Sequence, residues 1–246
     1  MKKMILAGLL AVSMTFSGCD VLKSVGLGLS EYEMIAALKE ALTQGLFKGF
    51  DAFASPNQGN PLVRFAFPGE AAKIEKTLKD LGLSSLTNQV TAKFTDAMSL
   101  AVKEAQPIFV NSIKKMTIRD AANILLTDNK HAATQFFKAA MSPELMTAFL
   151  PIVDSTVRTT GAGKEYASIV KTYNALPFLD KKLEPNLNQF IAGRAIDAMF
   201  LYVGSEEENI REKIEFRKTD LLRRAFGYAD QYMKEKTGVS PGFGTR

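Results

Sequence analysis

The sequence predicts an all-α protein, a single globular and irregular bundle of about ten helices that follows a cleaved export signal. Apolar side chains recur at spacings of three and four residues through most of the chain, as in helices buried on one face. Glycine, proline and short polar clusters interrupt this pattern at uneven intervals, which excludes a solenoid of fixed repeat length. Only Arg64–Phe67 alternates as a strand does, and no second segment could pair with it.

Composition narrows the function classes. The chain has 246 residues, of which 46% are hydrophobic and 23% charged, so it belongs with ordinary globular proteins. One Cys, one His and no Trp exclude a disulfide framework and a Cys/His metal cage within the chain. A net charge of +5 over 246 residues is well below the positive charge expected of a protein that binds nucleic acid through a basic surface. We therefore expect no nucleic-acid partner, no metal and no cofactor.

The first residues predict export and lipid anchoring. Lys2 and Lys3 precede the apolar stretch Met4–Phe16, which is too short to cross a bilayer as an ordinary helix. Phe16-Ser17-Gly18-Cys19 then resembles the lipobox of bacterial lipoproteins, although Phe stands where Leu is more usual. An ordinary secretory signal with a chance cysteine is the alternative, but the chain's one Cys falls at the junction. We expect a signal peptide at 1–18 and acylation of the Cys19 thiol.

The residues after the signal predict where the protein is held. Asp20 resembles the signal that retains enteric-type lipoproteins at the inner membrane, so a periplasm-facing inner-membrane location is favoured over the outer membrane. Residues 19–29 are expected to form the lipidated Cys and a tether. Cleavage removes two lysines and leaves 29 basic and 26 acidic side chains, a net charge of +3.

The expected helical domain spans residues 30–236 and begins with a capped helix. Ser30 is the N-cap, and Glu33 completes a capping box. Turn formers in 55–61 predict a loop, and Arg64–Phe67 is expected to be an extended segment held by its two Phe side chains. A second helix ends at Gly82. The buried stripe of the first helix is Met34, Leu38, Ala41, Leu42, Leu46 and Phe50.

Proline and short polar motifs predict the next boundaries. An apolar face runs from Leu86 to Ala101, and Pro107 opens or bends the following helix. Thr117 with Asp120 is expected to cap a short helix over 121–125, after which a helix covers 133–140. Ser142-Pro143 predicts a new helix start, with a kink at Pro151, and Gly161–Gly163 precedes a helix that carries residues 166–173.

The last third has the strongest helical pattern. A helix from Leu187 to Tyr202 is expected to stop at Gly204, and Ser205 with Glu208 predicts a capping box for the next one. Thr219 caps a final helix that carries residues 222–233. Pro177 and Pro185 bracket a loop, and residues 237–246 are expected to be a flexible tail.

Four segments of the sequence stand out together, namely Leu29-Ser30-Glu31, Pro107–Thr117, Ala132–Lys138 and Arg211–Gly227. They resemble one bacterial family, the domain of unknown function numbered forty-one ninety-seven. Members of this family are often exported lipoproteins, and the resemblance covers roughly residues 28–230. Phe136 stands where the family often has Tyr, and Ile214 stands where a Pro often breaks the penultimate helix. The resemblance implies the envelope location and the all-α fold, and it implies no activity.

Four motifs could in principle bind a ligand or take part in catalysis, and each has a simpler structural explanation. Gly161-Ala162-Gly163-Lys164 lacks the further glycine and the Ser/Thr of a phosphate loop, which favours a helix connector. His131 has no nucleophile motif nearby and is expected at the surface. Glu206–Glu208 are expected at a helix start, with Glu207 pairing with Arg211. Arg194 and Asp197 are expected to pair within their helix.

The main basic concentration is the candidate interaction patch. It could contact anionic phospholipid headgroups beside the anchor, or an acidic partner. The alternative is a solvated face balanced by Glu212, Glu215 and Asp220. The patch consists of Arg211, Arg217, Lys218, Arg223 and Arg224.

These observations favour a lipid-anchored envelope protein of unknown biochemical function that binds a protein partner and is not an enzyme. The alternative is a carrier of an apolar or acyl ligand, since 17 Phe and 10 Met could line a helical groove as well as fill a core. An enzyme that uses only carboxylates and hydroxyls ranks third. The sequence does not indicate the oligomeric state.

Overall fold

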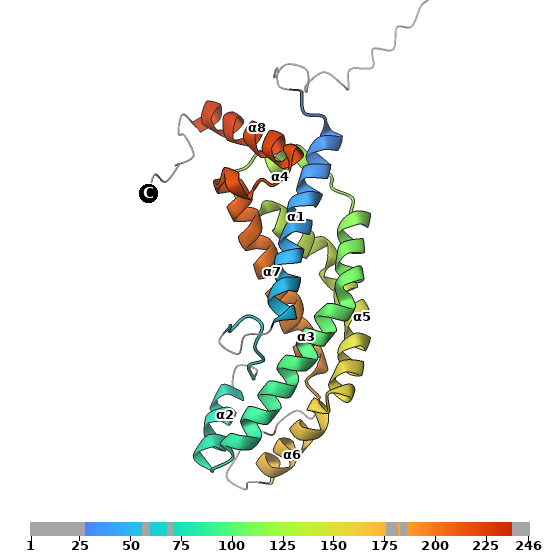
Figure 1. Ribbon diagram of the computed structural model, residues 1–246, viewed down its shortest axis with the longest axis vertical. Helices are drawn as coiled ribbons and strands as arrows, with labels where there is room; N and C mark the ends of the chain where they lie inside the picture. The colour runs from blue at the N-terminus through green and yellow to red at the C-terminus, as the bar shows by residue number, and fades with distance from the viewer. Residues whose placement is uncertain (1–27, 56–59, 68–70, 176–181, 183–185, 238–246) are drawn as a thin grey trace, which may run out of the picture.

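Four long helices form an antiparallel bundle whose order around its axis follows the order along the chain (Figure 1). The computed structural model describes residues 28–55, 60–67, 71–175, 182 and 186–237. Within it, α1 packs on α3, α3 on α5, and α5 on α7, and α7 returns to α1. The bounds are α1 (Glu31–Ala54), α3 (Ser84–Lys115), α5 (Ala132–Thr159) and α7 (Asn188–Glu212).

Shorter elements close the two ends of the bundle. At one end, α2 (Ala71–Asp80) and α6 (Ala162–Asn174) pack on α3. At the opposite end lie α4 (Ala121–Leu125), the 3₁₀ helix η1 (Ile214–Phe216) and α8 (Asp220–Thr237). The start of α1 lies at this second end, beside α8 (Figure 1). The first described residues therefore lie at the end of the bundle that carries α4, η1 and α8.

Local sequence signals set the starts of the first and last helices. Ser30 Oγ accepts a hydrogen bond from the Glu33 amide at 3.2 Å, and the Glu33 carboxylate accepts one from the Ser30 amide at 3.0 Å. Thr219 Oγ1 likewise accepts from the Leu222 amide at 3.2 Å, which caps α8. Both predicted caps are confirmed, and all six residues of the predicted α1 stripe are buried.

Between α1 and α2, residues 61–63 form a turn, and residues 65–67 that follow belong to no helix or turn. Phe65 and Phe67 are 1% and 6% exposed, and the Phe65 ring lies 4.7 Å from the ring of Phe94 on α3. The Phe65 amide donates to Thr95 Oγ1 at 3.0 Å, so it needs no partner strand. The two Phe side chains are buried as predicted, but the expected extended segment is shorter, because Arg64 lies in a bend and its amide donates to the Asn60 carbonyl.

The described chain forms eight α-helices rather than about ten, because three predicted breaks are absent. The helix α3 continues through Pro107, α5 through Ser142-Pro143, and α7 through Gly204-Ser205. Ser142 Oγ caps no new helix and donates to the Lys138 carbonyl at 2.6 Å, one turn back. Each long helix has neighbours along its length, and this packing outweighs the local cost of Pro or Gly.

Two further boundaries differ from expectation in detail. Asp120 precedes α4 with a left-handed φ of 59° and makes no side-chain cap, so the predicted Thr117–Asp120 cap is wrong. The helix α7 does end before Ile214, at Glu212, although Ile214 stands where the family often has Pro. The predicted signal peptide with Cys19 and Asp20, the loop between Pro177 and Pro185, and the tail beyond Thr237 lie outside the described residues.

Candidate functional site

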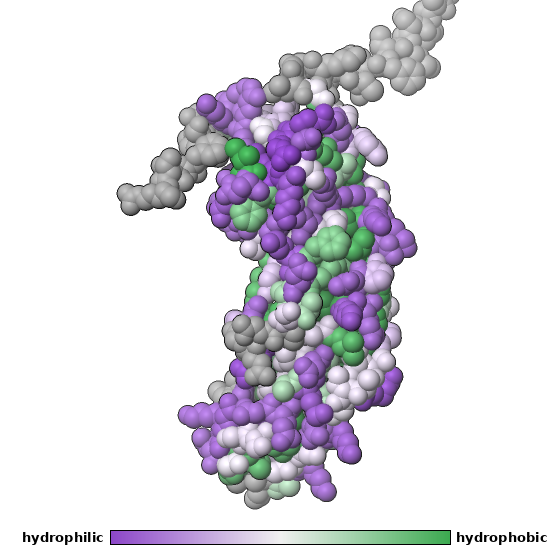
Figure 2. Space-filling view, viewed as in Figure 1, coloured by the Kyte–Doolittle hydropathy of each residue, from purple (hydrophilic) through white to green (hydrophobic). Residues whose placement is uncertain are grey.

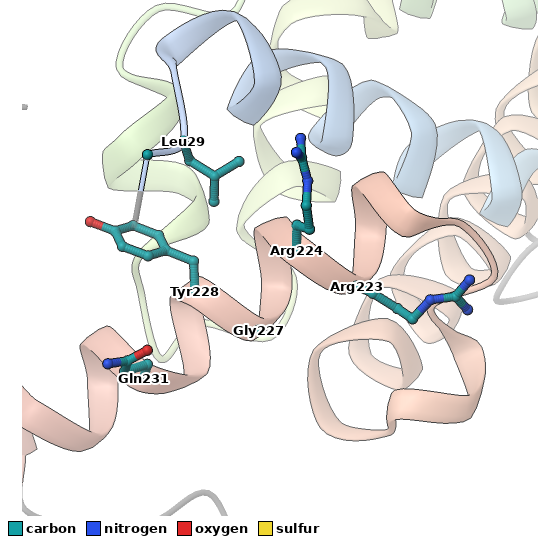
Figure 3. A pocket seen from close by; sticks show the side chains of 7 residues that line it. Leu29, Arg223, Arg224, Gly227, Tyr228 and Gln231 are labelled. Carbon is teal, nitrogen blue, oxygen red and sulfur yellow. The ribbon is translucent and has the colours of Figure 1, made fainter. Parts of the chain in front are cut away.

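An open hollow of about 370 Å³ lies where the described chain begins (Figure 3). Gly28 and Leu29, which directly precede α1, form one side of it, and α8 forms the other. The opposite face of α8 is buried through Leu222, Ala225 and Phe226, so the helix is amphipathic. The α8 residues that line the hollow are Arg223, Arg224, Gly227, Tyr228 and Gln231.

The two arginines of the hollow point in different directions (Figure 3). Arg224 forms an ion pair with Glu33 and so joins α8 to the first turn of α1. Arg223 pairs with Asp220 at 2.9 Å and donates to the Arg217 carbonyl at 2.9 Å. Their side chains are 51% and 60% exposed, respectively, so solvent screens both ion pairs. The positive charge of this face therefore remains accessible from outside.

Glu33 connects the capping box of α1 to α8. The Ser30 amide, the Ser30 hydroxyl and the Arg224 guanidinium all donate to its carboxylate, and together they lower the pKa of Glu33 below its ordinary value of 4.5. The largest contribution is the Ser30 amide. Each donor favours the ionised carboxylate.

This lowered pKa predicts a pH dependence of stability. Because the pKa of Glu33 is lower in the folded chain, its contribution is complete above pH 4.5 and is lost as the pH falls through the folded value. We expect the melting temperature of Glu33→Gln to lie below that of the wild type at neutral pH, and the gap to close in acid. Thermal melts of both proteins between neutral and acidic pH measure the gap. The control is Glu31→Gln, exposed in the same turn, and an equal gap there would contradict the assignment.

The structure divides the five residues of the candidate interaction patch. Lys218, Arg223 and Arg224 are exposed, whereas Arg217 is 3% exposed and the Arg211 side chain is 9% exposed. Arg217 donates to the carbonyls of Ile210 and Arg211 at 2.8 Å each and pairs with Asp230 at 2.7 Å. These buried contacts close the turn between α7 and α8. Only the three exposed residues can meet a partner.

Arg211 is buried because it pairs with Glu207, a buried carboxylate on the same helix. Glu207 is fully buried, and its two oxygens accept hydrogen bonds from the amides of Ala133 and Thr134 at 2.9 and 2.7 Å, and from the Thr134 hydroxyl at 2.7 Å. Arg211 pairs with Glu207 at 2.9 Å, as expected from their spacing, and donates to the carbonyls of Ile124 and Leu125. Two residues of α7 therefore cap neighbouring helices: Glu207 caps the start of α5, and Arg211 caps the end of α4.

The expected role of the three glutamates at a helix start is therefore wrong. Glu206–Glu208 lie inside α7, which begins at Asn188, and Glu207 instead caps the start of a neighbouring helix. Glu206 is 4% exposed and accepts from Gln44 Nε2 at 2.6 Å, a contact between α1 and α7. Gln44 also donates to the Phe216 carbonyl at 2.9 Å.

Comparison with known families places most of the chain in one family. Residues 28–227 match the family described as protein of unknown function (DUF4197). The chain belongs to this family. No curated protein and no solved structure matches the chain. The DUF4197 match begins and ends at glycines that line the hollow, Gly28 and Gly227, and the lining residues Tyr228 and Gln231 lie beyond it.

His131 of this DUF4197 protein has a structural role at the start of α5. Its Nδ1 lies 3.1 Å from the Gly204 carbonyl oxygen, and because a carbonyl only accepts, this nitrogen carries the hydrogen. Its Nε2 lies 3.8 Å from Glu208. Glu212 and Glu208 also bind Lys130, and these hydrogen bonds raise the pKa of Lys130 above its ordinary value. His131 does not line the hollow beside α8.

The remaining motifs form no reactive group. Asp197 pairs with Lys138 on α5 at 2.9 Å rather than with Arg194, whose buried Nε has no hydrogen-bond partner among the described residues. The expected pair within α7 is therefore wrong. Gly161 has a left-handed φ of 72° and joins α5 to α6, as a helix connector does, whereas Ala162, Gly163 and Lys164 already belong to the first turn of α6.

A second hollow of about 590 Å³ lies between Arg64 and the exposed face of α3. It is lined mainly by polar side chains, namely Arg64, Ser85, Asn88, Gln89, Thr91, Thr95 and Asp96, together with Ala92. Across the described part of the chain, no three His, Cys, Asp or Glu side chains gather closely enough to hold a metal ion. By length and composition, α5 is the one described helix that could cross a membrane.

Sequence reasoning missed most of the residues that line the first hollow. Arg223 and Arg224 were identified from charge, but Leu29, Tyr228 and Gln231 were not. A helical projection of α8 would have found the last two, since residues 224, 228 and 231 share one face. Leu29 could not be found in this way, because it lines the hollow with α8 only in the folded chain, and the two are almost 200 residues apart in the sequence.

Proposed function

We propose that this protein is a lipid-anchored component of the cell envelope that binds a partner protein and is not an enzyme. The observation that carries the proposal is Cys19, the chain's one cysteine, placed at the end of an export signal in a lipobox. Asp20 supports retention at the inner membrane with the domain facing the periplasm. More than one acyl chain gives stable anchoring, whereas a single chain gives marginal binding.

The geometry supports binding rather than catalysis. Both oxygens of Glu207 are engaged by amides, a hydroxyl and Arg211. Arg217 is likewise engaged by two carbonyls and Asp230. Such groups hold helices together and are not poised to transfer a proton to a bound substrate. The most conspicuous ionic cluster therefore stabilises the fold.

No comparable observation favours a carrier of an apolar ligand. Ten Phe side chains lie in the buried core, and the residues that line the two hollows are mostly polar. The ten are Phe50, Phe53, Phe65, Phe67, Phe94, Phe109, Phe137, Phe149, Phe200 and Phe226. Their placement fits the role of core packing.

Lipid anchoring predicts that the protein carries no lipid once the sulfur atom of Cys19 is removed. We expect Cys19→Ala to abolish incorporation of radiolabelled palmitate in cells, because the thiol sulfur is the acceptor of the diacylglyceryl group. Gel autoradiography of the immunoprecipitated protein measures the label. Cys19→Ser, which keeps the size and polarity of the side chain, is the matched control for signal processing and is also expected to carry no label. Label that persists on either variant would refute the lipoprotein assignment.

Protein binding is tested by crosslinking in cells with the anchor intact. A photo-crosslinking amino acid is placed at the most exposed apolar positions along the bundle, Tyr32, Phe47, Leu81, Leu201 and Ile214. We expect a discrete adduct with one envelope protein at some of these positions and not at others. A domain that forms no such adduct, and that copurifies with a lipid in native mass spectrometry, would favour the carrier instead.

A further inference from the structure

The tether limits which end of the domain can stay near the membrane. Nine peptide steps join Cys19 to Gly28 and span at most about 30 Å when fully extended. Gly28 and Leu29 are placed against α8, at the end of the bundle that carries the start of α1. The helix α1 then extends about 36 Å away from this point. We call the end formed by the first turn of α1, η1 and α8 the tether end.

The basic side chains of the tether end are concentrated in η1 and α8. Residues 213–236, which contain η1 and all but the last residue of α8, hold seven basic and four acidic side chains, a net charge of +3. With Glu31 and Glu33 of the first turn of α1, the tether end as a whole has a net charge of +1. The nearest opposing charges from α1 are Glu31 and Glu33, and Glu33 is already paired with Arg224. Lys114 and Lys115 end α3 near Lys39 of α1 and add positive charge.

The exposed side chains of the tether end suit a headgroup region. Tyr32 in the first turn of α1 is 80% exposed, and tyrosine is enriched where protein meets the membrane–water boundary. Tyr228 lies in the hollow between α8 and Leu29 (Figure 3). Polar side chains cover much of this end of the molecule, as they do the opposite end, and apolar ones also reach the surface here (Figure 2), among them Ile214 of η1, which is 50% exposed. The surface is thus polar and basic, with aromatic side chains among the charges.

We propose that the tether end lies against the anionic phospholipid headgroups of the membrane that holds the anchor. The exposed face of α8 supplies the basic side chains, and Tyr32 enters the headgroup layer. The proposal rests on the anchoring of Cys19 proposed above. It directs the opposite end, with α2 and α6, into the periplasm, where a partner would meet it.

The experiment imposes the anchor chemically, so it does not depend on lipidation in cells. Cys19 is the only thiol, and maleimide-bearing lipid in vesicles can couple the mature chain at that residue alone. The chain has no Trp, so Tyr32→Trp supplies a unique fluorophore at the tether end. Phe47→Trp is the matched control, an exposed aromatic position on the same helix about 22 Å further along. Brominated lipids in the vesicles then report which indole touches the bilayer.

In phosphatidylcholine vesicles that contain phosphatidylglycerol, we expect quenching of the Tyr32→Trp variant and not of the Phe47→Trp variant. Added salt should reverse the quenching, because it screens exposed charges. Absence of quenching at position 32, equal quenching at position 47, or quenching that is unchanged without phosphatidylglycerol would overturn the proposal. Crosslinks in cells from an unquenched tether end to an envelope protein would also overturn it, in favour of a protein partner.

Charge removal gives a second, matched test. Lys218→Gln with Lys234→Gln removes two exposed charges from the tether end, and Lys76→Gln with Lys164→Gln removes two from the opposite end. We expect the first pair to shift the balance between docked and free domain by about five- to twenty-five-fold, and the second pair to leave it unchanged. Equal effects of the two pairs would overturn the proposal, since they would reflect net charge rather than this surface.

Discussion

Replacing Glu207 with Ala is expected to lower the free energy of unfolding by about 3–5 kcal/mol, as removal of one member of a buried ion pair does. The substitution leaves the amides of Ala133 and Thr134 without their acceptor at the start of α5. It also leaves the Arg211 guanidinium, whose side chain is 9% exposed, without its counter-charge. Urea unfolding followed by circular dichroism at 222 nm, a wavelength sensitive to helix, measures the change.

The neighbouring residue provides the matched control. Glu208 is on the same turn of α7, but its side chain is 38% exposed and lies within ion-pair distance of Lys130 and His131. We expect Glu208→Ala to cost no more than about 1 kcal/mol. If Glu207→Ala and Glu208→Ala proved equal, the cap of α5 by α7 would contribute nothing to stability. Glu207→Gln, which keeps one acceptor oxygen, should fall between the two.

The position of Glu207 illustrates what sequence could and could not predict. Its pairing with Arg211 follows from a spacing of four residues on one helix, and the structure contains that pair. Its burial and its contact with the start of α5 do not follow, because they depend on a helix more than 70 residues away. Local spacing predicts contacts within a helix, whereas a cap supplied by another helix requires the tertiary arrangement.

The predicted helix breaks failed for the same physical reason. Gly204 and Ser205 are ordinary signals for the end of one helix and the start of the next. In the folded chain, Gly204 is buried against α5, and a Cβ at this position would lie 3.4 Å from the His131 ring. The glycine is thus explained by close packing between helices rather than by a turn. Ser30 and Thr219, whose caps were predicted correctly, each follow residues that belong to no helix, namely 28–29 and 217–218.

The candidate site was also predicted only in part. Clustered basic residues in 211–224 were evident from the sequence, but their exposure was not. Arg217 is buried because the turn between α7 and α8 leaves carbonyls that need donors, and its guanidinium reaches two of them. Arg223 and Arg224, a few residues later, lie on the outer face of α8. The division follows from which side of α8 packs on the bundle.

Replacing Gly45 with Ala is expected to destabilise the protein by about 1–3 kcal/mol, even though Ala favours helix over Gly by about 1 kcal/mol. A Cβ on Gly45 would lie 2.6 Å from Val203 Cα and 3.1 Å from the Val203 carbonyl oxygen. Both atoms belong to the backbone of α7, so no side-chain rotation can make room. The two helices would have to separate, which would also strain the Gln44–Glu206 contact one residue away. Thermal and urea unfolding measure the loss.

Gly49, one turn further along α1, makes the matched comparison. A Cβ there would lie 2.7 Å from the Met199 sulfur and terminal methyl, which are the far end of a flexible side chain that can move aside. Gly49→Ala is therefore expected to change the free energy of unfolding by less than about 1 kcal/mol, with the helix preference of Ala offsetting the repacking. If Gly45→Ala were the milder of the two, the closest approach of α1 and α7 would not lie at Val203. Because both substitutions add the same methyl group to the same helix, their difference isolates the contact between the two backbones.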